Sequence, residues 1–130
     1  MAKNLLLAIL GLALVIETAL TVGSFFAPAK TLEVFKVAAT VDTYFLVHVI
    51  AWCLLFICLI CVLAIREIRR DATVGWTLSA ILGIWWIGIG AAIYFVFGRP
   101  DNLALDSLKG ALILLATWKS WPAGGKSGIL

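Results

Sequence analysis

Charged residues are scarce in this sequence. Of its 130 residues, only 13% are Asp, Glu, Lys or Arg, whereas 64% are hydrophobic and the mean hydropathy is +1.13. Soluble domains carry about 25% charged and about 45–50% apolar residues. The chain therefore has too few polar side chains to cover a surface that faces water. Its length predicts one domain, residues 1–130, with no room for a separate extramembrane module.

Residues that bind metals or carry out catalysis are also few. The chain has one histidine and three cysteines, so no ligand cluster predicts a metal site. Cys53, Cys58 and Cys61 share one apolar run, and we predict buried thiols that pack as hydrophobes. The alternative is a redox pair of Cys58 and Cys61 on one helix face. No nucleophile motif or basic face is present, so we expect neither an enzyme nor a nucleic-acid partner.

Four apolar runs predict the fold. They are residues 5–26, 43–65, 74–97 and 103–121. A helix needs about 20 mainly apolar residues to cross a bilayer, and the first three runs meet this clearly. The fourth is weaker because it carries Asp106 and Lys109. Backbone groups must pair within the segment inside a bilayer, so we predict an all-α membrane protein with four transmembrane helices in a bundle.

The first run resembles a secretory signal peptide, but its length and Glu17 predict a retained span instead. Between the first two runs, residues 31–35 predict a short interfacial helix, with Leu32 and Phe35 in the headgroup region. The third connection, 98–102, consists of residues that stop helices.

The basic residues predict the orientation. With four spans, both termini and the second loop share one side of the membrane. That side holds Lys3, Arg66, Arg69, Arg70, Lys119 and Lys126, and the other holds Lys30, Lys36 and Arg99. Six against three predicts a multi-pass protein with cytoplasmic N- and C-termini. Trp76, Trp118 and Trp121 then mark the cytoplasmic interface, and Tyr44 and Tyr94 the outer one.

Small residues recur along the third run. Gly75, Ser79 and Gly83 follow at four-residue spacing, and Gly88 and Ala92 repeat the pattern. Such spacing lets helix backbones approach closely. We expect these residues to pack helices within the bundle, and the alternative is a contact with another protein.

Glu17 is the most unusual residue of the first run. A charged residue near a span's centre costs about 2.5–3.5 kcal/mol on insertion scales. Ala13, Glu17, Thr21 and Ser24 follow at spacings of four, four and three, so they form one polar stripe on the helix. Such a stripe is expected to face protein or water rather than acyl chains.

The topology places three more polar residues near the depth of Glu17. His48, Asp106 and Lys109 all fall in the outer half of the predicted bundle. Asp106 lies three residues before Lys109, a spacing that allows an ion pair. We predict a proton or ion-pair site of these four residues, in which Glu17 contacts Lys109 or His48. One interpretation is mutual neutralisation that fixes helix register, and the other is a proton or cation site.

His48 allows a separate interpretation. A lone imidazole within a span can ligate haem iron or the magnesium of a chlorophyll-type pigment. One histidine cannot supply two axial ligands in one chain, so no resident cofactor is predicted and pigment binding at His48 stays an alternative.

Two resemblances follow from short motifs. The chain resembles the small multidrug resistance transporters at three places: Glu17 with Thr21, residues 86–90 and residues 98–99. Those are four-span antiparallel homodimers with one membrane-embedded glutamate, which implies Glu17 as the proton- and substrate-binding carboxylate. Lys109 has no counterpart in that family.

Residues 26–28 and the basic turn 66–71 resemble bacterial four-span membrane proteins of unknown function, which implies an inner-membrane setting. We therefore predict a non-catalytic accessory or structural subunit of a larger membrane assembly. Its partners are lipid and other membrane subunits or copies of itself. The alternatives are a homo-oligomeric proton-linked transporter that uses Glu17 and a pigment-binding subunit that uses His48.

Overall fold

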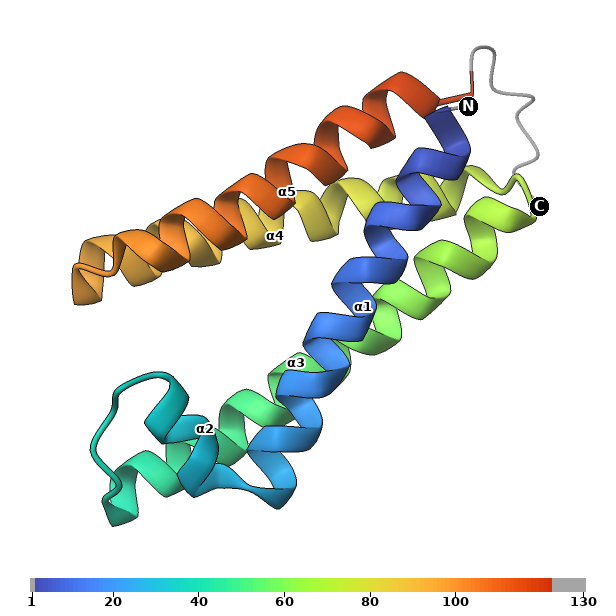
Figure 1. Cartoon of the computed structure of the whole chain (residues 1–130). Helices are drawn as coiled ribbons and strands as arrows, with labels where there is room; N and C mark the ends of the chain where they lie inside the picture. The colour runs from blue at the N-terminus through green and yellow to red at the C-terminus, as the bar shows by residue number, and fades with distance from the viewer. Residues whose placement is uncertain (1, 123–130) are drawn as a thin grey trace. The chain divides into compact units, whose positions relative to one another are not determined.

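All regular secondary structure in the described part of the chain is helical. A computed structural model of the protein describes residues 2–122, apart from the side chains of Phe97 and Asn102. The helices are α1 (Ala2–Phe26), α2 (Pro28–Val34), α3 (Val41–Arg69), α4 (Thr73–Phe97) and α5 (Pro100–Ser120) (Figure 1). The predicted helical class is therefore confirmed, whereas Lys126 of the orientation argument lies outside the described residues.

Three helices are long and apolar enough to cross a membrane: Ala2–Phe26, Val41–Arg69 and Thr73–Val96. A short helix is present between the first two runs as α2, but it begins earlier than predicted, and its Leu32 is buried in the protein rather than open to headgroups. The fourth predicted span is also a helix, α5, but it is not among the three candidates. It carries four charged residues, which are Asp101, Asp106, Lys109 and Lys119.

The described residues divide into two compact units. The first holds the residues up to Gly11 and those from Cys61 onward, and the second is Leu12–Ile60. The division falls within α1 and α3, so each unit takes part of both helices. A single membrane domain over residues 1–130 stays a prediction.

In the first unit, α4 and α5 form a helical hairpin and lie side by side (Figure 1). Gly98 ends α4 with φ 64°, and its N–H donates to the Tyr94 carbonyl at 2.8 Å. Glycine suits this left-handed cap because it has no Cβ to clash. Pro100 then starts α5, where its missing N–H costs no helical hydrogen bond.

Two glycines set the distance between α4 and α5. A Cβ placed on Gly110 would lie 2.5 Å from the Gly83 carbonyl oxygen and 2.8 Å from the Ile87 nitrogen. A Cβ on Gly83 would meet the Leu114 side chain at 2.7 Å. The two helix backbones are therefore in direct contact, as small residues at helix crossings allow.

In the second unit, α1 and α3 meet through side chains. Thr18 and Thr21 each place a hydroxyl 3.8 Å from the Cys58 sulfur. Phe25 meets Trp52 edge to face, with ring centroids 5.3 Å apart. Trp52 thus lies level with the end of α1, so the part of α3 that precedes it extends past that end.

Two helices are followed by a residue other than glycine in the left-handed conformation. Lys36 follows α2 with φ 56°, and Asp71 follows α3 with φ 58°. In each case the N–H of this residue and that of the next return to carbonyls of the last turn, which is the Schellman motif. The bonds are Lys36 to Glu33 and Val37 to Leu32, both 2.9 Å, and Asp71 to Ile68, 3.1 Å, and Ala72 to Glu67, 3.0 Å.

Candidate functional site

The predicted polar stripe is the buried face of α1 in the second unit. Glu17 is 3% exposed, and Ala13, Thr21 and Ser24 are also buried. The Thr21 hydroxyl donates to the Glu17 carbonyl oxygen at 2.6 Å, so it satisfies itself on its own helix. The α1 helix turns these polar groups away from its exposed surface, as the sequence spacing predicts.

His48 lies elsewhere in the second unit. Its side chain is exposed, and Nδ1 lies 2.8 Å from the Tyr44 carbonyl oxygen. A carbonyl oxygen only accepts, so in the neutral tautomer that fits this contact Nδ1 carries the proton and Nε2 has the lone pair that could bind a metal-containing cofactor.

The structure does not bring Glu17 and His48 together. The register set by Phe25 and Trp52 places Glu17 level with residues near position 60 of α3. That level is about twelve residues, or roughly 18 Å along the helix, from His48. The prediction assumed that the end of α1 and the start of α3 lie at the same level, whereas α3 extends well beyond the end of α1.

In the first unit, α5 turns its charged pair toward α4. Lys109 Nζ lies 3.1 Å from Asp106 Oδ1, and both side chains are about four-fifths buried. The same ammonium lies 4.6 Å from the centroid of the Trp86 ring. The three-residue spacing correctly predicted the ion pair, and the indole face adds a cation–π contact.

The four predicted site residues thus separate into two pairs. Glu17 and His48 belong to the second unit, whereas Asp106 and Lys109 belong to the first. A Glu17–Lys109 contact stays a prediction. Within residues 2–122, no group of three or more His, Cys, Asp or Glu side chains is placed to hold a metal ion.

The small residues of α4 also separate into two groups. Gly75, Ser79 and Gly83 are buried, and a Cβ on Gly75 would lie 2.5 Å from the Ile68 nitrogen. Gly88 and Ala92 are exposed, and a Cβ on Gly88 would meet nothing within 4 Å. The first group therefore packs helices within the unit, and the second does not.

Sequence reasoning missed Gly110, although a signal was available. The short turn after α4 fixes the register of the hairpin, so a residue of α4 faces a calculable position of α5. Ser107 reaches the Ile87 carbonyl in this register, at 3.4 Å. Counting outward from the turn would have placed Gly110 opposite Ile87 and Gly83 opposite Leu114, two contacts that the structure contains.

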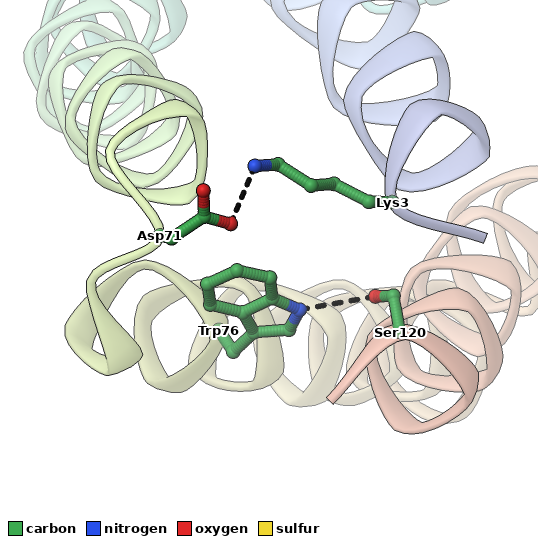
Figure 2. Close-up of polar contacts among 4 residues, drawn as sticks. All are labelled: Lys3, Asp71, Trp76 and Ser120. Atoms are coloured by element: carbon green, nitrogen blue, oxygen red, sulfur yellow. Dashed lines mark hydrogen bonds and ion pairs between the residues drawn. The ribbon is translucent and has the colours of Figure 1, made fainter. Parts of the chain in front are cut away.

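A second missed cluster joins three helix ends of the first unit (Figure 2). Lys3, at the start of α1, reaches Asp71 in the α3–α4 turn, with 2.6 Å between Nζ and Oδ1. The Trp76 indole N–H donates to the Ser120 hydroxyl at 3.1 Å. That hydroxyl donates in turn to the Ala116 carbonyl at 2.7 Å. The sequence marked Trp76 only as an interfacial aromatic.

The cysteines follow the predicted burial in part. Cys58 and Cys61 are buried, and all three thiols are free. The Cys61 thiol donates to the Leu10 carbonyl oxygen at 3.4 Å. Cys53 is exposed, which corrects the expected burial, because five residues turn it about 140° around α3 from the buried Cys58.

The α4–α5 turn carries its own charge pair. The Arg99 guanidinium contacts both Asp101 oxygens, at 2.9 and 3.2 Å. This hydrogen bonding and the carboxylate charge raise the pKa of Arg99. The pair orders the segment between Gly98 and the first turn of α5.

Comparison with known proteins returns no match to a family model, a curated protein or a solved structure.

Proposed function

We propose that this chain is a four-span integral membrane protein that acts as a non-catalytic accessory or structural subunit of a larger membrane assembly. The observation that supports a partner most directly is the exposed stripe of Gly88 and Ala92 on α4. We further propose a bacterial inner membrane and cytoplasmic termini, which the charge distribution favours.

The polarity of α5 supports a fourth span. Between residues 104 and 118, every exposed side chain is apolar, while Asp106, Ser107 and Lys109 are turned inward. The exposed set is Ala104, Leu105, Leu108, Ala111, Leu112, Leu115 and Trp118. A helix at a water-facing surface shows the reverse arrangement, whereas charged residues within spans face the protein interior.

The length of α3 agrees with this placement. Its 29 residues extend about 43 Å, which exceeds the roughly 30 Å hydrocarbon core. The excess leaves room for the exposed Arg66, Arg69 and Arg70 outside the core. This supports the proposed position of these cations at the cytoplasmic surface.

The proposed partner surface consists of the small residues of α4 that do not pack against other helices of the first unit. Gly88 and Ala92 lie four residues apart on an exposed face, beside the exposed Ile84 and Trp85. Small residues at this spacing let a second helix approach closely in a membrane. Because Gly75, Ser79 and Gly83 already serve packing within the first unit, the outer pair is left for another helix.

Native mass measurement after gentle extraction tests this proposal. We expect the wild-type chain to carry at least one further protein subunit, and Gly88→Leu to release it. Gly11→Leu is the matched control, because a Cβ on Gly11 also meets nothing within 4 Å. A chain that travels alone, or equal loss of the subunit from both variants, would contradict the proposal.

A second candidate, a homo-oligomeric proton-linked transporter, is favoured by the burial of Glu17. A carboxylate at 3% exposure beside the hydroxyl-bearing stripe has the setting of a proton-exchange site. Glu17→Gln should then abolish proton-linked flux in proteoliposomes, whereas Glu33→Gln, at an exposed carboxylate of α2, should not. Unchanged flux in Glu17→Gln would eliminate the transporter.

The exposed His48 side chain, whose Nδ1 contacts the Tyr44 carbonyl and leaves Nε2 for a ligand, favours a third candidate, a pigment-binding subunit. This candidate requires a visible absorption band in the purified protein that disappears in His48→Ala. A colourless protein from its native membrane would eliminate it.

A further inference from the structure

The first unit contains a narrow groove between the start of α1 and the second half of α5. Its volume is about 90 Å³, and its lining residues are Ala2, Leu5, Ile9, Leu112, Leu115, Ala116 and Lys119. All of these side chains are apolar except Lys119. The groove therefore combines a hydrocarbon wall with a single cation.

The polar and apolar parts of the groove lie at opposite ends. Ala2 and Lys119 belong to helix termini that the cluster in Figure 2 holds at one end of the unit. Ile9 and Leu112 each lie seven residues further in, about 10 Å along their helices. The groove thus runs from a cationic mouth to an apolar interior, which is the polarity of an amphiphile with an anionic head.

Lys119 is available to bind an anion. Among the described residues it forms no ion pair, whereas Lys3 at the same end is paired with Asp71. Trp118 and Trp121 flank it, and both are exposed. Exposed tryptophans near a span's end mark the headgroup depth of a bilayer, so Lys119 lies where lipid phosphates lie.

We propose that this groove binds one acyl chain of an anionic phospholipid, whose headgroup phosphate contacts the Lys119 ammonium. The inference rests on the membrane placement of α5 given under the proposed function. Basic pockets between spans are known to hold anionic headgroups at the cytoplasmic side. Here the wall of Leu5, Ile9 and Leu112 adds a place for the chain, so the site distinguishes an intact lipid from a free phosphate.

The test is native mass spectrometry of the full chain with added phosphatidylglycerol or phosphatidylcholine of equal chain length. We expect phosphatidylglycerol to be retained more strongly, and Lys119→Gln to lower its retention about fivefold. Lys30→Gln is the matched control, because Lys30 is an exposed lysine of α2 without an ion pair among the described residues. Soluble glycerol phosphate, which lacks chains, should not compete.

Ile9→Phe tests the chain-binding wall separately. The larger side chain fills the inner end of the groove, so it should lower the retention of both lipids without changing their ratio. Equal retention of the two lipids by the wild type, or equal loss from Lys119→Gln and Lys30→Gln, would overturn the proposal. Protein subunits and lipids add different masses, so loss of the lipid site is distinguishable from absence of a partner subunit.

Discussion

Two helix pairs of this protein differ in the kind of contact that holds them together. They are the hairpin of α4 with α5 and the seam of α1 with α3. In the hairpin, Gly83 and Gly110 bring two backbones into contact. In the second unit, the seam is formed by Thr18 and Thr21 against the Cys58 thiol. Backbone contact cannot adjust to added volume, whereas side chains can change rotamer. Helices of similar composition therefore differ in how much change they tolerate.

We expect the largest effect from a substitution that disrupts the backbone contact between α4 and α5. Gly110→Leu places a side chain where even a Cβ lies 2.5 Å from the Gly83 carbonyl oxygen. We expect a loss of more than about 3 kcal/mol in the free energy of unfolding, since overpacked cores commonly lose 1–3 kcal/mol when neighbours can still shift. Tryptophan fluorescence during denaturation in mixed micelles measures the loss.

Gly11→Leu is the control for that experiment, because its Cβ would meet no atom within 4 Å. It should be neutral or stabilising, as leucine is the better helix former. Equal destabilisation by both substitutions would show that backbone contact between α4 and α5 is not what limits volume at Gly110.

The next effect concerns the buried charges of α5. Lys109→Met leaves the Asp106 carboxylate without its nearby cation and removes the contact with Trp86. We expect a loss of about 2 kcal/mol, since breaking a buried pair costs more than the pair contributes. Adding Asp106→Asn should restore at least half of that loss. A double variant that is less stable than Lys109→Met alone would contradict this account.

Sequence reasoning succeeded where one physical rule dominates. The need to satisfy the backbone in lipid converts long apolar runs into helices, and the predicted runs agree with α1, α3, α4 and α5 to within a few residues. Local spacing also predicted the Asp106–Lys109 pair. Both results depend on neighbours along one helix, which a sequence displays directly.

It failed where the relative level of two helices decides the outcome. The Glu17–His48 contact required α1 and α3 to start at one level, but the 14 residues between them, 27–40, leave that level undetermined. The short turn after α4 fixes the level of α5, so the contact of Gly110 with Ile87 could have been predicted. The length of a connection therefore limits how far a site can be inferred from sequence.

A third expected effect compares the two non-glycine helix ends. Lys36→Gly relieves a left-handed conformation that costs L-residues about 1 kcal/mol, so the second unit should become more stable by that amount. Asp71→Gly relieves the same strain in the first unit but removes the ion pair with Lys3. It should therefore gain less, and an equal gain would show that the ion pair contributes nothing to stability.

The smallest expected effect compares two buried threonines. Thr21 donates to the Glu17 carbonyl, whereas the Thr117 hydroxyl has no hydrogen-bond partner among the described residues. Thr21→Val should lower the free energy of unfolding by about 1 kcal/mol, and Thr117→Val should raise it slightly. Thermal unfolding followed by circular dichroism measures both, and the reverse ranking would contradict the assigned hydrogen bond.

The ion pair between Lys3 and Asp71 has a consequence for the order of assembly. The two residues are 68 positions apart, so the pair cannot form until the ribosome has completed α3 and the turn after it. By contrast, α4 and α5 are joined by two residues and can pair as one hairpin as soon as α5 is complete. The start of α1 thus lacks this partner until α3 and the turn after it are complete. With cysteines at positions 3 and 71, the time at which a cross-link forms during synthesis would show when the start of α1 meets the turn after α3.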